Sequence, residues 1–547
     1  MTKPVDLTNP TGTDNDNPKK RQHSSLWNNI PWEVVSWLVI ILLPLIWLWP
    51  RLLNPAFEMI DDPHDLKRLL AMKQDFFGWL KTDAVHGEIG EGRFRPMYWL
   101  LRFVIYFLPA QLNPAGWIYI HYINLAVSLT LFFLLLTAIS KKSTVGLLGT
   151  SLWIFNTNTI ANYIRLATQE VWQVLWVGSL LITGFSILNS PRDRNTGWLK
   201  LASILTLFLL YFTKETSLIL FPFSITMLCL SLVFKQKRKE WGQFVFVNLI
   251  FVSIYFLLAP NRTGYASNYQ PSLEQIRNNL ASFFYIQWHY LFLILLGTYL
   301  WRLLKYRKNL SGWHIEKWQF ALLILGLAFF VIYLPWKVYV RRYLLVTDFL
   351  LSGFMALELG YWMLHARRIY ATILGLFCLL AMTLSTAQLP MAIQSIYESA
   401  FSHTKGTVHA LEWLCQKAEK GSAILSLELE PELTGATVLY TQYFFQRKDM
   451  PIYSLSDYAV NLQNAGYNVV PIQQITDEIL ERMDYIFWDH RGRTNPRLEL
   501  FNLKIFHAII QSSFRNRLSQ IYSDVQVKNG IKEGPEILKL SRAPNTA

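Results

Sequence analysis

MIDDPHD (residues 59–65) is an acidic stretch that comes shortly after the first long apolar run, which ends near Pro50. Carboxylates beside a membrane exit are costly unless they face water or take part in chemistry. The same connection later carries GRFRPMYW (residues 92–99), so acids and a pair of arginines share one loop. We expect this loop, with acidic groups beside cationic ones, to organise the rest of the chain.

Apolar residues dominate the composition. Of the 547 residues only 16% are charged, against roughly 25% in an ordinary soluble domain. The apolar residues gather in many blocks close to the ~20 residues that cross a bilayer as a helix. An α-helical polytopic membrane protein is therefore predicted. The net charge of +14 is then used to decide which loops face the cytoplasm, because cytoplasmic loops collect Lys and Arg. Since the membrane class accounts for this charge, no nucleic-acid partner is predicted.

The N-terminal segment and the cysteines narrow the class further. Residues 1–31 begin polar and have no early apolar core, so we expect a disordered cytoplasmic tail and no cleaved signal peptide. The three cysteines, Cys229, Cys378 and Cys415, fit neither a disulfide framework nor a zinc site.

Hydropathy and loop charge predict about 11 transmembrane helices within a domain of residues 32–390. With the N-terminus in the cytoplasm, the short basic connections fall inside and the acidic or mixed ones fall outside. The predicted spans are approximately residues 34–50, 116–139, 145–155, 171–188, 199–212, 218–234, 244–259, 290–304, 320–335, 344–364 and 371–389.

A large first extracytoplasmic loop, residues 51–111, contains two predicted juxtamembrane helices. Between Leu66 and Leu80, apolar residues recur at helical spacing and basic residues fill the other face, which is typical of a helix in the membrane interface. Residues 98–108 are apolar but too short to span, and Pro109 ends them.

The composition changes after Leu389. Short β-like runs alternate with helical stretches, which predicts an extracytoplasmic soluble α/β domain over residues 391–547. The runs are residues 423–429, 452–455, 469–472 and 485–488, and the helices are expected over 475–483 and 506–518.

Asp61 and Asp62 are the candidate catalytic residues. Asp62 before Pro63 is also a good helix start, and capping explains Asp62 in part but leaves Asp61 available. A carboxylate near a dry interface can act as general base for a hydroxyl. His64 and Asp65 fit the same helix start, and His64 is kept as a supporting residue.

Basic residues on the predicted outer side oppose the charge rule and therefore indicate an anionic ligand. Arg93 and Arg95 precede the second juxtamembrane helix, whereas Arg341 and Arg342 stand at the edge of the tenth span. Lys214 stands at the edge of the fifth. Snorkelling to lipid headgroups is the plain alternative. The functional interpretation is a clamp for a phosphate that gains charge as a bond to it breaks.

Further supporting candidates are Tyr98, Glu170, Glu215 and Tyr343. Glu170 opens the fourth span, where the helix dipole alone would favour an acid. Glu215 follows Lys214, and a local ion pair is its plain explanation. Together the charged candidates share one membrane face, and they are Asp61, Arg93, Arg95, Glu170, Lys214, Glu215, Arg341 and Arg342.

Three buried-looking polar residues receive structural predictions. Asp348 is expected to neutralise Arg341 or Arg342, which lie about one turn away. Glu358, nearer the inner end, is expected to pair with a loop cation. His121 is expected to be a buried histidine with hydrogen-bond partners rather than a catalyst.

These motifs resemble those of the GT-C superfamily, multispanning glycosyltransferases such as protein O-mannosyltransferases and lipid A aminoarabinose transferases. The resemblance covers roughly residues 32–389. It rests on the acidic pair, the juxtamembrane helices, residues 92–96, Lys214 with Glu215, and Arg342 with Tyr343. It implies transfer of a sugar from a polyprenyl-phosphate donor to an acceptor glycan, lipid or protein on the extracytoplasmic face.

By this resemblance Asp61 or Asp62 would be the catalytic base, and Arg93, Arg95, Lys214 and Arg342 would contact the donor phosphate. Some members use a divalent metal, Mg²⁺ or Mn²⁺, with a second outer acid. Glu170 could supply that acid beside Asp61, but no second acidic pair follows, so metal dependence stays open. A direct, inverting displacement needs one base and an activated leaving group.

Two other classes stay open. A transporter or flippase of a lipid-linked sugar would place charges or broken helices near the bilayer midplane, whereas the charges here gather at one face. A non-catalytic envelope assembly protein would instead bind a partner through its outer domain. The sugar and the acceptor are not predicted, and a bacterial inner membrane is the default location.

Overall fold

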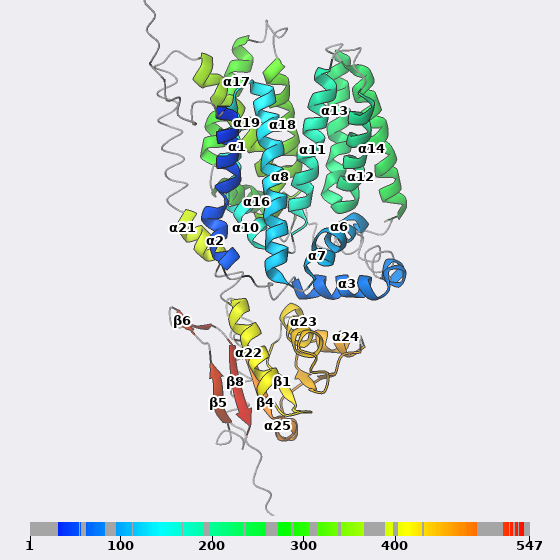
Figure 1. Ribbon diagram of the computed structural model, residues 1–547, viewed down its shortest axis with the longest axis vertical. Coiled ribbons are helices and arrows are strands. Elements are labelled where there is room, and N and C mark those ends of the chain that lie inside the picture. The colour runs from blue at the N-terminus through cyan, green and yellow to red at the C-terminus, as the bar shows by residue number, and fades with distance from the viewer. Residues whose placement is uncertain are drawn as a thin grey trace, which may run out of the picture.

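A bundle of helices and a smaller domain at one end of it make up the protein (Figure 1). The computed structural model describes residues 31–53, 55, 62–82, 94–111, 113–166, 168–190, 196–233, 237–258, 272–285, 289–306, 314–336, 341–365, 389–397, 403–428, 431–464, 466–489, 518–523, 526–528, 531–533 and 535–540.

The bundle consists of helices that range from 8 to 27 residues in length. They are α1 (Trp32–Leu42), α2 (Leu45–Leu53), α8 (Pro114–Ser140), α9 (Ser143–Ile154), α10 (Thr157–Ile164), α11 (Glu170–Asn189), α12 (Gly197–Thr213), α13 (Leu220–Val233), α14 (Arg238–Leu258), α16 (Leu273–Tyr285), α17 (His289–Tyr306), α18 (His314–Val331) and α19 (Leu345–His365). The 3₁₀ turns η4 (Glu215–Ile219) and η6 (Arg341–Leu344) lead into α13 and α19.

Length and hydropathy fit several of these helices to a bilayer. Among the described residues four helices are long and apolar enough to cross it, and a fifth is reached if α1 and α2, bent by 42°, count as one span. The bend falls beside Pro44, as expected where proline interrupts a helix. A helix lies at each predicted span except the eleventh, residues 371–389, which is outside the described residues. The polytopic membrane class is confirmed, and the count of 11 remains a prediction.

Close packing holds the centre of the bundle together. The ring of Phe132 on α8 lies 6.0 Å from Trp153 of α9 and 4.1 Å from Phe349 of α19. Gly149 allows α9 to approach α19 closely, because a side chain at this position would place its Cβ only 3.0 Å from the Cβ of Ala356 on α19. Small residues at such crossings are typical of membrane helices, which gain stability from backbone proximity.

The first loop lies across one end of the bundle, between it and the smaller domain (Figure 1). Its segments are α3 (Asp62–Gln74), α4 (Phe76–Trp79), α6 (Pro96–Leu101), the π-helix η3 (Arg102–Phe107) and α7 (Leu108–Ala110). Leu66, Leu69 and Met72 of α3 are buried against the bundle. Helices therefore lie where the two juxtamembrane helices are predicted, with a break at Asp75, whose carboxylate caps α4 by accepting from Gly78 N–H.

The smaller domain is built on a mixed sheet in the order β3-β2-β1-β4-β8-β5. Four strands are parallel neighbours, β1 (Ile424–Ser426), β2 (Ile452–Ser454), β3 (Val469–Pro471) and β4 (Tyr485–Asp489). β8 (Pro535–Leu540) pairs antiparallel with β4 and with β5 (Leu518–Ser523). A hairpin pairs β6 (Gln526–Lys528) with β7 (Ile531–Glu533).

Helices complete this domain, and they are α22 (His403–Lys417), α23 (Pro431–Val438), the π-helix η8 (Leu439–Phe444), α24 (Tyr458–Asn464) and α25 (Asp477–Arg482). The short α21 (Leu389–Tyr397) precedes them. Each of the four predicted β-like runs contains a strand, and α25 lies within predicted helix 475–483. The helix predicted over residues 506–518 is wrong at Leu518, which begins β5, and its other residues lie outside the described part.

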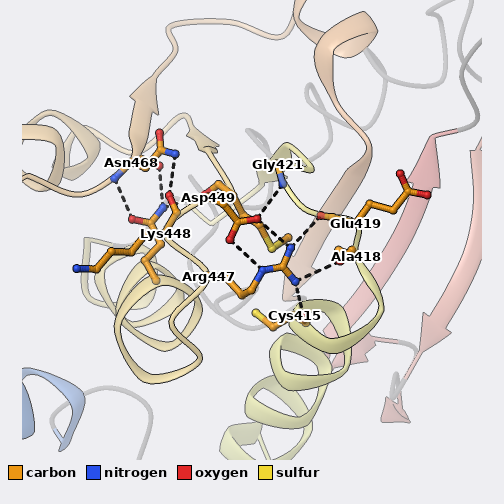
Figure 2. Close-up of polar contacts among 10 residues, drawn as sticks. Cys415, Ala418, Glu419, Gly421, Arg447, Lys448, Asp449 and Asn468 are labelled. Carbon is orange, nitrogen blue, oxygen red and sulfur yellow. Dashed lines mark hydrogen bonds and ion pairs between the residues drawn. The ribbon is translucent and has the colours of Figure 1, made fainter.

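One arginine fastens the end of α22 to the turn before β2 (Figure 2). Arg447 donates to the backbone carbonyls of Cys415 and Glu419 and forms an ion pair with Asp449 at 3.0 Å. Asp449 also accepts from the N–H of Gly421, which has the left-handed φ of 81°. The hydrogen bonds from Arg447 lower the pKa of Asp449 to about 2.

Candidate active site

Segments that are distant in sequence meet at the end of the bundle nearest the smaller domain (Figure 1). The junction of α12 and η4 contacts α6, the start of α11 and the region of η6. Helix α3 lies against η3 in the same layer. Those residues that were predicted to share one membrane face and that the structure describes thus lie at one end of the bundle.

Lys214 and Glu170 form a buried ion pair at this end. Lys214 is 5% exposed and Glu170 is 3% exposed, and the lysine ammonium donates to the glutamate carboxylate. Helix α12 ends at Thr213 and Lys214 is extended, with φ −152°, which turns its side chain toward the first turn of α11. Two site candidates predicted from separate spans are therefore direct partners. Their attraction offsets part of the free-energy cost of burying each charge.

The aromatic ring of Tyr343 packs against the lysine of this pair. The ammonium of Lys214 lies 4.7 Å from the centre of the Tyr343 ring, within the range in which a cation is attracted to a ring face. Tyr343 itself stacks on Tyr333 at 5.6 Å. A second link across the same junction runs from Gln173 of α11 to the hydroxyls of Thr216 and Ser217, at 2.9 Å each.

The first loop approaches this pair through Phe94 and Arg95. The ring of Phe94 meets that of Phe212, two residues before Lys214, at 5.7 Å. Arg95 is 2% exposed, precedes α6, and lies 5.8 Å from the ring of Tyr98. Arg95 is therefore buried within the protein, which argues against the alternative that its side chain snorkels to lipid headgroups.

A charged cluster that the sequence analysis missed joins α3 to the second juxtamembrane helix. Arg102 of η3 donates to Asp65 of α3 at 2.6 Å, and the hydroxyl of Tyr98 donates to the same carboxylate at 3.0 Å. Asp65 thus does more than favour a helix start. The available signal was a lone arginine inside an apolar run, which needs a partner because burying an unpaired charge is costly.

Helix α10 is a second feature that the sequence analysis missed. Its residues fall between the predicted third and fourth spans and its start is rich in Asn and Thr, yet Asn156, Asn158 and Asn162 are all buried. The side chain of Asn158 donates to Asp348 at 2.6 Å. Asp348 therefore has a neutral partner, and its predicted pairing with Arg341 or Arg342 involves side chains outside the described ones.

His121 is buried with a partner at each ring nitrogen, as predicted. Nδ1 lies 2.8 Å from the hydroxyl of Tyr106, and Nε2 lies 3.3 Å from the carbonyl of Asn162.

The prediction for Glu358 is wrong. Its partner is Arg302 of α17, at 2.6 Å, inside the bundle rather than in a loop. Gln319 of α18 and Trp362 also donate to the Glu358 carboxylate, at 2.8 Å each. Both ionic side chains are almost fully buried, so the cluster fastens α17, α18 and α19 together.

Several predicted site residues are placed only in part. Asp61 and Arg93 lie outside the described residues. Asp62 and His64 lie in the first turn of α3, and Arg341 and Arg342 begin η6, but their side chains are not among those described.

Two further points concern acidic groups. Glu215 begins η4 directly after Lys214. Within the described part of the chain, no group of three or more His, Cys, Asp or Glu side chains could hold a metal ion. Glu170, the acid considered for a metal, pairs with Lys214 instead, while its other suggested ligand, Asp61, is outside the described residues.

The fold has counterparts among solved structures. The apo oligosaccharyltransferase of Archaeoglobus fulgidus aligns with a TM-score of 0.51 and 12% identity, over 85% of this chain and 70% of that one. ArnT from Cupriavidus metallidurans in the apo state aligns with a TM-score of 0.50 and 10% identity, over 94% of this chain and 100% of that one. The chain has the fold that these two solved structures share.

This likeness concerns the fold alone, since the sequence identities are low. It confirms the predicted architecture of a polytopic helical protein. No protein-family model matches the sequence, and no curated protein matches it as a relative.

Proposed function

We propose that the chain is a membrane glycosyltransferase that moves a sugar from a polyprenyl-phosphate donor to an acceptor hydroxyl. The observation that carries the proposal is the buried Lys214–Glu170 pair beneath Tyr343, at the end of the bundle that the first loop crosses. The fold shared with an oligosaccharyltransferase supports the reaction class.

Lys214 suits the phosphate of such a donor. An ammonium has three N–H donors, and the carboxylate of Glu170 accounts for one of them. Glu170 and the Tyr343 ring keep the cation in a site with little water, where its attraction to a phosphate is strong. Arg93, Arg95, Arg341 and Arg342 complete the proposed phosphate site.

The transfer itself is a single displacement. Asp61 or Asp62, directly before or at the start of α3, removes the proton of the acceptor hydroxyl. The hydroxyl oxygen then bonds to the anomeric carbon, and the bond from that carbon to the phosphate oxygen breaks. The polyprenyl phosphate leaves with the electron pair and is stabilised by the cations, so the configuration of the sugar inverts.

A divalent metal is the alternative means of stabilising the leaving group. A metal ion held by Glu170 would have to displace Lys214 from its partner. We therefore propose that Lys214 takes the charge of the leaving phosphate. Mg²⁺ or Mn²⁺ would then be dispensable, and transfer should survive EDTA.

Donor binding tests the phosphate site. The double variant Glu170→Gln/Lys214→Gln removes both charges together, which avoids leaving one buried charge without its partner. We expect the purified full-length chain to bind undecaprenyl phosphate about ten- to a hundredfold more weakly, because charge-assisted hydrogen bonds contribute ~1.5–3 kcal/mol. Lys142→Gln, an exposed position before α9 that lies outside the proposed phosphate site, is the matched control and should bind as the wild type does. Unchanged affinity in the double variant would falsify the phosphate site.

Transfer tests the base. Membranes that contain the Asp61→Asn/Asp62→Asn variant should bind undecaprenyl phosphate normally but release no sugar from radiolabelled polyprenyl-phosphate hexoses and pentoses. The wild type, with and without EDTA, is the reference. Full transfer by the double Asn variant would rule out both carboxylates as the base.

A further inference from the structure

Helices α11, α12, α13 and α14 form one side of the bundle (Figure 1). A large apolar cavity lies between them. Its volume is about 920 Å³, and residues of α17 and α18 also line it. Leucine and phenylalanine dominate the walls, among them Leu181, Leu207, Phe223 and Phe244. A cavity of this size and composition suits a hydrophobic ligand.

The length of the cavity matches one leaflet of a bilayer. Its wall on α11 runs from Val177 to Asn189. At 1.5 Å per residue this stretch is about 18 Å long, whereas the hydrocarbon of one leaflet is roughly 15 Å deep. The occupant therefore has chains of ordinary lipid length.

Three lysines line the same end of the cavity. Lys200 lies in the first turn of α12, Lys237 directly precedes α14, and Lys317 lies in the first turn of α18. Glu240 also lines this rim and lies 3.8 Å from Lys237, so the formal charges of the three lysines and this glutamate sum to +2. An anionic headgroup complements a lining of that charge, whereas a zwitterionic one does not.

Aromatic residues mark the rim as an interface. Trp241 and Trp318 each neighbour the rim in sequence and line the cavity. Tryptophan collects where lipid headgroups meet hydrocarbon, because its ring is amphipathic. The lysines thus stand at headgroup level above an acyl-chain compartment.

We propose that this cavity binds an anionic phospholipid from the leaflet at that end, with its chains among the apolar walls and its phosphate among Lys200, Lys237 and Lys317. The sequence predicts this leaflet to be the cytoplasmic one. The site is separate from the proposed donor-phosphate site, because Lys200 and Lys214 lie fourteen residues apart along α12, about 21 Å. The inference does not depend on the glycosyl-transfer proposal.

Retention of lipid by the purified full-length chain tests the headgroup site. Native mass spectrometry after equilibration with phosphatidylglycerol or phosphatidylcholine should show selective binding of the former. The variant Lys200→Gln/Lys237→Gln/Lys317→Gln should bind phosphatidylglycerol about ten- to a hundredfold more weakly, since each lysine near an anionic lipid strengthens binding by roughly fivefold. The matched control replaces three lysines outside the cavity lining, Lys141, Lys142 and Lys239, and should bind normally.

A glycine inside the cavity provides a test of the apolar compartment that leaves every charge in place. A Cβ on Gly184 would meet open space, so Gly184→Leu fills the cavity without a backbone clash and should lower retention. Gly297 has the same open space but lies outside the cavity lining, so Gly297→Leu is its control.

Three outcomes would overturn the proposal: equal phosphatidylglycerol binding by the wild type and the three-lysine cavity variant, equal loss in the lysine control, or displacement of phosphatidylglycerol by undecaprenyl phosphate. The last would assign the cavity to the donor's chain.

Discussion

Arg102 connects the first loop to itself across thirty-seven residues. Its guanidinium is 2% exposed and holds Asp65 at 2.6 Å, while the Tyr98 hydroxyl donates to the same carboxylate. Since Asp65 stands in the turn that begins with Asp62, this pair fixes where the proposed base lies relative to Arg95.

Replacing Arg102 should therefore affect both stability and activity. Arg102→Met leaves Asp65 without its cation, and we expect a loss of about 2–4 kcal/mol, toward the lower end for a carboxylate that keeps some exposure. Thermal unfolding in detergent measures the loss, and Lys73→Met on the exposed face of α3 is the control. Asp65→Asn/Arg102→Met, which removes both charges, should recover part of it. A single variant as stable as the wild type would contradict this role.

At the residue scale, the sequence identifies side chains better than their partners. Lys214 and Glu170 were predicted to share a face, and the structure brings them into contact with each other and Lys214 into contact with Tyr343, which was predicted as a supporting residue. Arg102 and Arg302 were missed because each stands alone in an apolar run. Their partners, Asp65 and Glu358, are distant in sequence, so the pairs exist only after tertiary packing.

At the scale of the element, helix α22 ends in a cap built from another part of the chain. Arg447 donates hydrogen bonds to backbone carbonyls at the C-terminal end of α22 and forms an ion pair with Asp449 (Figure 2). Carbonyls at a helix end otherwise lack partners, so the Asp449 charge stabilises this end of α22 indirectly.

Acid should remove this stabilisation. The pKa of Asp449 falls from 3.8 to about 2 on folding. A lowered pKa in the folded state means that the stabilisation is complete above the unfolded value and disappears as pH falls through the folded value. The urea midpoint of the smaller domain, followed by tryptophan fluorescence of the full-length chain, should therefore decline between about pH 4 and 2.

Asp449→Asn should start with a lower midpoint at neutral pH and lose part of this decline. Asp457→Asn, at an exposed position, should behave as the wild type. An identical acid response in Asp449→Asn and the wild type would assign the decline to other groups.

Apolar patterns predict the helices of this fold well, since hydropathy locates ten of the predicted spans and periodicity locates the amphipathic α3. Helix α10 shows the limit. Its polar start is typical of a loop, yet it is a buried helix in which the side chain of Asn158 donates a hydrogen bond to Asp348 on α19. The bend between α1 and α2 was also missed, although Pro44 was visible.

At the scale of the whole molecule, α3 separates the bundle from the smaller domain and contacts both (Figure 1). The ammonium of Lys67 lies 4.8 Å from the ring of Tyr467. Phe444 of η8 packs against the core of the bundle as well as that of the domain. The side of the membrane inferred from loop charge thus corresponds to the end of the bundle where α3 and the smaller domain lie. The contacts between α3 and the domain join residues that are distant in sequence, so no local sequence pattern could predict them.

Labelling from each side of the membrane should confirm that arrangement. In a background without native cysteines, Lys73→Cys and Asp457→Cys should react with an impermeant maleimide from the extracytoplasmic side. Lys141→Cys, at the opposite end of α8, should react only after the membrane is permeabilised. Labelling of Lys73→Cys and Asp457→Cys from opposite sides would refute the topology.

Helix α3 is a thermodynamic link, because it packs into the core of the bundle and also contacts η8, whose Phe444 packs against both hydrophobic cores. Whatever strengthens the position of α3 also strengthens the hold of the domain on it, and the effect runs equally in both directions. Binding of the proposed donor beside α3 should therefore make the domain more resistant to acid, and a domain loosened by acid should bind that donor less tightly. A fall of the pH below about 4 would in this way slow the proposed sugar transfer before any membrane helix unfolds.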